Sequence, residues 1–361
     1  MSVVSLVIPM LAAAGVAAAV TPIVGRLARA VGVIDRPDER KVNRRENIPL
    51  LGGLAVALGF LVGLSVATML SGDAARFRGH LEGQILGSLI LLALGVVDDR
   101  RPLNAWPKLA GQLCAAGVAI FYGFRIEHLS DPITQTVFSL PAVLVWAVSL
   151  LWIVGITNAM NLMDGLDGLT TGVGVIIGTT LTLISFQAGE TVGVLIGVVF
   201  VGALLGFLPY NFPPARIFLG DTGALFIGFN LSLLALEGYR KASMLTFVVP
   251  LLALAVPLLD TALSIYRRVR RRASILSPDR QHMHHRLLES EGSHRAAVLS
   301  IWFLTACFCV IAVSFTNLEG WAALVFLALV IVLTLRLLRN LGFFAVQGAQ
   351  EPVDSREEEA R

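Results

Sequence analysis

Long apolar runs recur along the whole chain and are separated by short polar connections. Runs of about 15–22 apolar residues are long enough to cross a bilayer as helices. They predict eleven transmembrane helices, at residues 3–24, 51–71, 81–97, 109–124, 139–157, 169–187, 191–208, 223–238, 244–265, 296–314 and 321–338. Pro250 and Pro257 predict a kink in the ninth. With 56% hydrophobic and 15% charged residues, the chain is neither an ordinary soluble protein nor disordered. We expect an all-α, polytopic membrane protein.

The ends of the chain differ in character. No Lys or Arg precedes the first apolar run, whereas Arg26 and Arg29 follow it. A secretory signal has the reverse flanks, so the pattern predicts an uncleaved first helix with its N-terminus outside. The three cysteines lie in apolar runs and indicate no disulfide framework. We expect one transmembrane catalytic domain over residues 1–346 and a disordered tail at 347–361.

Basic residues are divided unequally between the two sets of connections that eleven crossings define. The connections after odd-numbered helices, with the end of the chain, hold 23 of the 28 Lys and Arg residues. Because positively charged loops stay in the cytoplasm, this set is predicted to be cytoplasmic, and so is the C-terminus. The net charge of +3 is too small to indicate a nucleic-acid partner.

The polar motifs that could carry chemistry all follow odd-numbered helices. They are Asp98-Asp99, the stretch 158–172, Gly220-Asp221 and a histidine cluster at 282–285. A transporter would place polar groups along a path to both membrane faces, whereas these motifs gather at one. The distribution favours an enzyme at the inner membrane surface over an ion-coupled transporter.

The stretch 158–172 brings carboxamides, carboxylates and glycines between two apolar runs. Asn158, Asn161, Asp164 and Asp167 recur every three residues, so on a straight helix the first and last face opposite ways. A helix that ends here and loosens at its glycines would let the stripe curl around a ligand. Oxygen-rich side chains suit a hard cation such as Mg²⁺ or the donors of a nucleoside. The alternative is a helix end capped by Asn and Asp.

Two adjacent carboxylates end the third predicted helix. Asp98 and Asp99 repel each other unless a cation neutralises the pair. They suit a metal ligand or a general base beside a substrate hydroxyl or phosphate. The alternative is a solvated junction neutralised by Arg100 and Arg101. Lys108, just before the fourth helix, is either a phosphate partner or a positive-inside anchor.

Two single carboxylates lie at the edge of, or within, apolar runs. Asp221 begins the eighth predicted helix, where an acidic residue can act as a cap. The glycines Gly220 and Gly223 beside it leave the backbone open to a phosphate or a metal. Asp260 lies inside the ninth run, and an intramembrane carboxylate of this kind is a candidate functional group.

The histidine cluster follows the ninth helix and a run of arginines. His282, His284 and His285 stand with two arginines, one of which is Arg280. Zinc is disfavoured because no cysteine or second histidine group accompanies them. Histidine together with arginine suits the charge of a substrate phosphate. Isolated histidines, His294 among them, are treated as incidental.

Five motifs occur in a defined order along the chain. They are Asp-Arg-Pro from residue 35, Val-Val-Asp-Asp-Arg from 96, Asn-Ala-Met-Asn-Leu-Met-Asp-Gly-Leu-Asp-Gly from 158, Asn-Phe-Pro-Pro-Ala from 211 with Gly-Asp-Thr-Gly from 220, and Ser-Pro-Asp-Arg-Gln-His-Met-His-His-Arg from 277. From about residue 20 to 300 the chain resembles the polyprenyl-phosphate N-acetylhexosamine-1-phosphate transferases (glycosyltransferase family 4), and within them the bacterial undecaprenyl-phosphate N-acetylglucosamine-1-phosphate transferases.

This resemblance implies a reaction and a location. N-acetylglucosamine-1-phosphate would move from UDP-N-acetylglucosamine to undecaprenyl phosphate, releasing UMP, as the first membrane step of a cell-envelope glycopolymer. Teichoic acid, lipopolysaccharide O-antigen and arabinogalactan pathways are all compatible with it. The protein would lie in the bacterial inner membrane among membrane lipids, with its active site on the cytoplasmic face. A homodimer through outer helices is compatible with the sequence, which does not determine the oligomeric state.

The resemblance also implies roles for catalytic and metal-binding residues. Asp221 and Asn161 would bind Mg²⁺, with Mn²⁺ as an alternative. Asp98 would deprotonate or orient the lipid phosphate, or act as a covalent nucleophile. Asp99 would hold that region in place, and Lys108 would bind phosphate. Both substrates are anionic, so their charge must be neutralised before attack.

Further residues would hold the nucleotide and its phosphates. By the same resemblance, Asp164, Asp167 and Asn211 would line the nucleotide pocket. The remaining phosphate-binding side chains would be Arg280, His282, His284 and His285. One departure from relatives is Asn43, where the first loop often has His, and this weakens any role for that position.

Alternatives of two kinds stay open. The same chemistry could use another UDP-N-acetylhexosamine, including that of the muramoyl-pentapeptide branch. In a different class, an ion-coupled transporter would use the buried carboxylates. A CDP-alcohol phosphotransferase is disfavoured because Asp164-Gly-Leu-Asp167 lacks the Ala-Arg of that motif. A lipid-binding scaffold gives no reason for the Asn/Asp stripe.

The predicted sidedness can be tested in intact cells. In a cysteine-free background, Thr134→Cys lies in the connection after the fourth helix and Ser274→Cys in the connection after the ninth. We expect a membrane-impermeant maleimide to label the first and to spare the second until the cells are opened. The reverse labelling pattern would place the chemical motifs outside.

Overall fold

The computed structural model describes residues 3–35, 47–71, 74–130, 136–239, 245–270, 272, 282–316, 318 and 320–340. Its helices are α1 (Val3–Ala30), α2 (Gly52–Ser71), α3 (Ala74–Arg100), α4 (Ala105–Phe121), α5 (Ala142–Met163), α6 (Leu169–Gln187), α7 (Thr191–Asn211), α8 (Gly220–Tyr239), α9 (Leu245–Ala253), α10 (Ala255–Arg270), α11 (Met283–Glu291), α12 (His294–Phe315) and α13 (Gly320–Asn340). Two antiparallel ribbons join β1 (Ile34–Asp35) to β2 (Ile48–Pro49) and β3 (His128–Ser130) to β4 (Val137–Ser139). The helical fold class is confirmed. The predicted tail and residues 36–46, with Asn43, lie outside the described residues.

Eight of the described helices are long and apolar enough to cross a membrane. They are α1, α2, α3, α5, α6, α7, α12 and α13. The protein is therefore a multi-pass membrane protein. Each of the eleven predicted runs does form a helix or a pair of helices, but eleven crossings and the orientation stay predictions.

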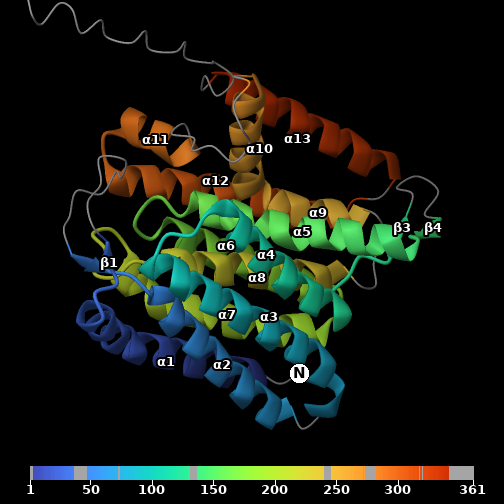
Figure 1. Ribbon diagram of the computed structural model, residues 1–361. Helices are drawn as coiled ribbons and strands as arrows, with labels where there is room; N and C mark the ends of the chain where they lie inside the picture. Colours follow the sequence, from blue (N-terminus) through green and yellow to red (C-terminus); the bar gives the residue numbers. More distant parts are fainter. Residues whose placement is uncertain are drawn as a thin grey trace, which may run out of the picture.

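The ninth predicted helix is two helices in the structure. The helix is interrupted at Leu254, between α9 and α10, close to the kink that the prolines predicted. Pro257 has no N–H to donate to the carbonyl of Ala253, and the thiol of Cys309 lies 3.8 Å from that oxygen. Figure 1 shows α10 standing upright across the direction of α5, α9 and α12. The short helix α11 follows and was not predicted, because its polar sequence carries no membrane signal.

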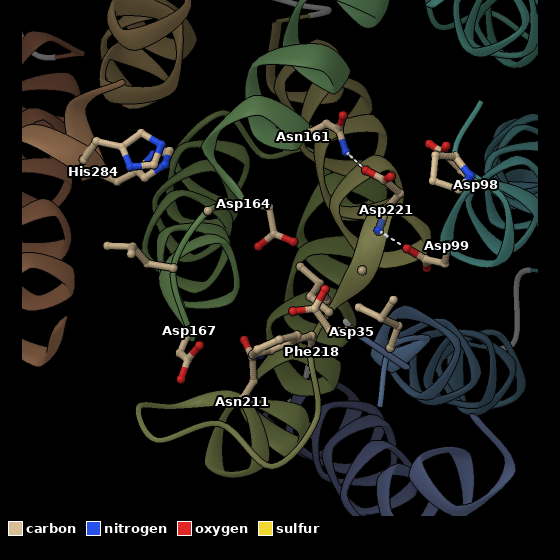
Figure 2. A pocket seen from close by; sticks show the side chains of 17 residues that line it. Asp35, Asp98, Asp99, Asn161, Asp164, Asp167, Asn211, Phe218, Asp221 and His284 are labelled. Atoms are coloured by element: carbon tan, nitrogen blue, oxygen red, sulfur yellow. Dashed lines mark hydrogen bonds between the residues drawn. The ribbon is translucent and has the colours of Figure 1, made fainter. Parts of the chain in front are cut away.

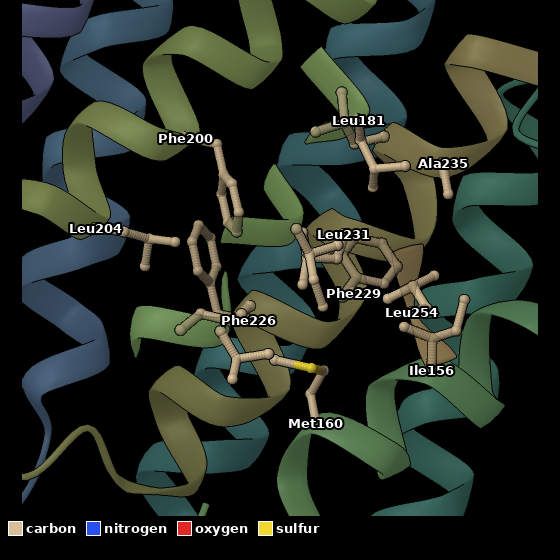
Figure 3. Packing of buried hydrophobic residues seen from close by; sticks show 14 of the residues in the cluster. Ile156, Met160, Leu181, Phe200, Leu204, Phe226, Phe229, Leu231, Ala235 and Leu254 are labelled. Carbon is tan, nitrogen blue, oxygen red and sulfur yellow. The ribbon is translucent and has the colours of Figure 1, made fainter. Parts of the chain in front are cut away.

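Helix α8 is the centre of the bundle. It contacts α2, α3, α5, α6, α7 and α9, and in Figure 1 it lies between them. Phe226, Phe229 and Leu231 on α8 are fully buried, and Figure 3 shows them packed among Phe200, Leu204 and Met160 of neighbouring helices. Because residues 222–237 of α8 are all buried, this part of the helix has no lipid-facing stripe.

Two glycines allow α8 to start close to its neighbours. A Cβ on Gly53 of α2 would lie 2.2 Å from the backbone nitrogen of Gly223, and one on Gly95 of α3 would lie 2.3 Å from the Cα of Thr222. Small residues of this kind let membrane helices approach closely. Further along, Asn230 of α8 bonds Gln84 and Ser88 of α3 at 2.8 and 3.1 Å. These contacts hold the end of α3 against the beginning of α8.

We expect Gly95→Ala to separate these two helices. Its methyl group would have to displace backbone rather than a flexible side chain, and such overpacking costs about 1–3 kcal/mol. The melting temperature in detergent should fall. Gly117→Ala on α4 is the control, because nothing lies within 4 Å of its added Cβ. Equal melting temperatures for the two variants would contradict the close approach.

Candidate active site

A cavity of about 400 Å³ lies where the C-terminal ends of α3 and α5 meet the N-terminal end of α8, β1 and α11. Figure 2 shows the side chains around it. Six carboxylates contribute to its wall: Asp35, Asp98, Asp99, Asp164, Asp167 and Asp221. Asn161, Asn211, Phe218, His284 and His285 complete the polar and aromatic lining. The structure therefore brings together the motifs that are far apart in the sequence.

Both carboxylate oxygens of Asp99 accept hydrogen bonds from the start of α8. Its Oδ1 accepts the backbone N–H of Asp221 at 2.8 Å, and its Oδ2 accepts the N–H of Thr222 at 3.1 Å and the hydroxyl of Thr222 at 2.6 Å. The first N–H groups of a helix have no partner within it, so Asp99 caps α8 from another helix. This arrangement leaves the side chain of Asp221 free to point at the cavity, as Figure 2 shows.

Lys108 joins two carboxylates from different helices. Its Nζ forms a close ion pair with Oδ2 of Asp98 and lies 3.3 Å from Oδ2 of Asp221. The other oxygen of Asp98 accepts the backbone N–H of Leu103 at 2.8 Å. Asp98 is 4% exposed, which excludes the solvated junction with Arg100 and Arg101. Lys108 thus holds the positive charge between Asp98 and Asp221.

The Asn/Asp stripe divides as α5 ends at Met163. The amide of Asn161 donates to Oδ1 of Asp221 at 2.5 Å. Asn158 faces away from the cavity and exchanges hydrogen bonds with Gln112 of α4. Asp164 follows the helix and lies on the cavity wall. The expectation that a straight helix cannot aim all four residues at one point is confirmed.

Asp167 and Asn211 line the cavity, but their side chains are already hydrogen-bonded to the loops and helices that form its wall. The Oδ2 of Asp167 accepts the N–H of Ala215 at 2.9 Å, and its N–H donates to Nε2 of His294 at 3.1 Å. Asn211 accepts from the hydroxyl of Thr171 at 2.7 Å and donates to the carbonyl of Ile217 at 3.0 Å. Treating His294 as incidental was wrong, because it fixes the backbone of the nucleotide-pocket candidate Asp167.

The histidine cluster begins α11. His284 and His285 line the cavity, whereas His282 lies behind them, its ring parallel to that of His284 with 5.7 Å between centroids. A Cβ on Gly165 would lie 2.2 Å from Nε2 of His284, so this ring packs directly on the loop that follows α5. Arg280, the fourth phosphate-binding candidate, lies outside the described residues.

Asp35 is a cavity residue that sequence reasoning passed over. It is 5% exposed and belongs to β1, which pairs with β2 through Asp35 and Ile48. β2 itself is bonded to the loop before α8, since the backbone N–H of Phe218 donates to the carbonyl of Pro49 at 2.9 Å. The sequence signal that could have identified Asp35 as a cavity residue was its position as the first residue of the Asp-Arg-Pro motif.

The oxygens at the cavity fit a hard divalent cation. Among the described residues, no three His, Cys, Asp or Glu side chains form a ready-made metal cage. Mg²⁺ does not need one, because it keeps several waters and binds through one or two carboxylates plus substrate phosphates. Oδ2 of Asp98 is buried and paired with Lys108, and Asp221 and Asn161 stand beside it.

Burial changes the protonation of two cavity residues outside the spanning helices. It raises the pKa of Asp164 to about 7, and the charges of Asp221, Asp99 and Asp167 act in the same direction. It lowers the pKa of His284 to about 3, helped by the charge of His285. His284 is therefore neutral at pH 7 and has one N–H to donate.

Comparisons with known proteins agree with these motifs. Residues 82–239 match the family model for glycosyl transferase family 4. A probable undecaprenyl-phosphate N-acetylglucosaminyl 1-phosphate transferase of Bacillus subtilis is 36% identical over 87% of this chain and 86% of its own. A decaprenyl-phosphate N-acetylglucosaminephosphotransferase of Mycolicibacterium smegmatis is 34% identical over 90% and 86%. A phospho-N-acetylmuramoyl-pentapeptide-transferase of Latilactobacillus sakei is 32% identical over 72% and 81%.

The raised pKa of Asp164 predicts a pH dependence of stability. The folded protein keeps a proton that the unfolded chain, with an ordinary pKa of 3.8, has lost. The free energy of unfolding should therefore fall as pH rises from about 4 to 7. In magnesium-free buffer, we expect the melting temperature of the wild type to fall more between pH 5 and pH 8 than that of Asp164→Asn. Parallel curves would contradict the raised pKa.

Proposed function

Because the chain belongs to glycosyl transferase family 4, we propose that it transfers N-acetylglucosamine-1-phosphate from UDP-N-acetylglucosamine to undecaprenyl phosphate. The products are UMP and a lipid-linked diphosphate sugar. The reaction serves as the first membrane step of a cell-envelope glycopolymer in the bacterial inner membrane, with the active site on the cytoplasmic face.

One observation carries this proposal. Asp98 and Lys108, from the ends of α3 and α4, meet Asp221 and Asn161 at the rim of a bundle of spanning helices. A lipid phosphate arriving through the bilayer and a nucleotide arriving from the aqueous side would meet at such a rim. The relatives named for this chemistry match most of the chain.

Charge balance supports a divalent cation in this reaction. Six carboxylates line the cavity, and both proposed substrates carry phosphate, so like charges face each other. Mg²⁺, or alternatively Mn²⁺, would neutralise the phosphates and polarise the one that is attacked. Asp221 and Asn161 would hold it, Asn161 by presenting its amide oxygen in place of the N–H that now faces Asp221.

The protein side chains then divide the remaining work. Asp98 has one oxygen fixed by Leu103, so Oδ2 is the atom that takes a proton from, or orients, the lipid phosphate. Lys108 exchanges its carboxylate partners for substrate phosphate. Asp99 keeps α8 in place, and Asp164 and Asp167 border the space for the nucleotide. His284 and His285 face the phosphates as hydrogen-bond donors.

A second candidate keeps the chemistry and changes the sugar. The relative named for phospho-N-acetylmuramoyl-pentapeptide transfer matches 72% of this chain, so another UDP-N-acetylhexosamine is the alternative donor. Incubating the purified protein with undecaprenyl phosphate, Mg²⁺ and a panel of UDP-sugars, and measuring UMP, separates the two. We expect UDP-N-acetylglucosamine to release UMP fastest, and no release with any UDP-sugar would refute the transferase proposal. The homodimer stays a prediction.

The proposed metal ligand can be removed without changing shape. Asp221→Asn keeps the size of the side chain and loses its charge; its oxygen can accept from Lys108, and its NH₂ can donate to the oxygen of Asn161 once that amide is turned over. We expect magnesium-dependent UMP release to fall about 10²–10³-fold, while the protein keeps its melting temperature. Glu127→Gln, an exposed carboxylate paired with Arg125 on the surface, should leave the rate unchanged. Turnover of Asp221→Asn at the wild-type rate would remove the assigned role.

The role of Asp98 makes a different prediction. Its Oδ2 is assigned to the lipid phosphate rather than to the nucleotide, so Asp98→Ala should lose UMP release while UDP-N-acetylglucosamine still binds. Rates and equilibrium binding of the labelled nucleotide are measured on the same preparation. If nucleotide binding disappears together with turnover, the assignment of Asp98 to the acceptor fails.

A further inference from the structure

We propose that Asp260 is a positioning residue that sets the histidines of α11 against the active-site cavity. It acts through His282 and does not itself line the cavity. The inference rests on the proposed function only for its kinetic test. Its geometry involves α10, α11 and the loop after α5.

Asp260 uses both carboxylate oxygens on the start of α11. It lies in α10, is 3% exposed, and precedes His282 by 22 residues in the sequence. Its Oδ1 accepts the backbone N–H of Met283 at 2.7 Å, and its Oδ2 lies 3.1 Å from Nδ1 of His282. A buried carboxylate with both oxygens bonded is not a free group on an ion path, which argues against the transporter role first considered for it.

The bond to Met283 replaces a missing helix cap. His282 is the N-cap residue of α11, but its side chain makes no cap hydrogen bond. Met283 is the first residue of the helix, whose N–H has no partner within it. Asp260 therefore anchors α11 to the membrane helix α10 and also places negative charge at its N-terminus, where it is favourable.

The hydrogen bond between Asp260 and His282 sets the tautomer of the imidazole as well as its position. A carboxylate has acceptor oxygens and no proton to donate, so the contact between Oδ2 and the imidazole is a hydrogen bond when Nδ1 of His282 carries the proton. A carboxylate behind a functional histidine commonly sets both ring orientation and tautomer. The ring of His282 is held parallel to that of His284, with 3° between the planes.

His284 connects His282 to the cavity, because its ring is parallel to that of His282 and it also lines the cavity. It is 3% exposed and packs on Gly165, so it has no room to change its position independently. Its Nδ1 is buried without a hydrogen-bond partner among the described residues, whereas His282 is satisfied. The chain of contacts thus runs from Asp260 through His282 to His284, and ends at the loop that carries Asp164.

The test compares variants that separate charge and tautomer from simple capping. In Asp260→Asn the amide oxygen can still cap Met283, but the amide N–H₂ now faces Nδ1 of His282 and demands the other tautomer. Thr261→Val is the matched control on the same helix, because the buried hydroxyl of Thr261 has no hydrogen-bond partner in the part of the chain that the structure describes. Melting temperature, kcat and KM for UDP-N-acetylglucosamine are measured for each.

We expect Asp260→Asn to keep its melting temperature within a few degrees while kcat/KM falls about 10–100-fold, the usual effect of removing the partner of a functional histidine. Thr261→Val should match the wild type in both. Adding Asp260→Asn to His282→Gln should cause no further loss, because the first residue acts through the second. Unchanged kcat/KM in Asp260→Asn, or losses that multiply in the double variant, would overturn the proposal.

A second measurement does not depend on turnover. Modification of histidines by diethyl pyrocarbonate, mapped by mass spectrometry, should be slow at His284 in the wild type and in Thr261→Val, and several-fold faster in Asp260→Asn. Equal modification in all three would overturn the positioning role. Absence of UMP release by the wild type would instead refute the proposed function and leave this measurement to decide the inference.

Discussion

The capping of α8 by Asp99 is the interaction on which the site depends. In a membrane protein an unpaired backbone N–H away from water costs several kcal/mol, and Thr222 in the first turn of α8 is fully buried. Asp99 satisfies the N–H groups of Asp221 and Thr222, and Gly95 lets α3 come close enough to do so. These hydrogen bonds of Asp99 place Asp221 beside Asp98, so that Asp99 is bonded to α8 while Asp98 is paired with Lys108.

The cavity is strongly acidic for a site that is proposed to handle phosphates. Six carboxylates line it, and Lys108 is bonded to two of the acidic side chains around it. In the proposed reaction, repulsion between these carboxylates and the substrate phosphates would weaken substrate binding, and a shared cation would offset that repulsion. The histidines on the opposite wall belong to a separate layer, anchored by Asp260 to α10. The two walls are therefore held by different helices, and Figure 2 shows them facing each other across the cavity.

Much of the site could be predicted because its motifs are local. Asp98, Asp221, Asn161 and Asp164 stand at the ends of apolar runs, and the distribution of basic residues predicts that these ends share one membrane face. The tasks of Asp167 and Asn211 were not visible in this way. Both look like ligand groups in the sequence, and both already bond backbone or side chains of their own scaffold, because buried polar groups take the nearest partner.

The sequence by itself determined the spanning helices and the motifs of the family, because apolar length and motif order are properties of the chain. Tertiary structure decided which face of each helix met which neighbour. Asn158 and Asn161 are three residues apart on α5, yet one bonds Gln112 and the other Asp221. The tertiary structure also decided that Asp260 of α10 bonds His282, the residue that precedes α11. Such pairings depend on how helices pack against one another, and a linear pattern of polar residues does not contain that information.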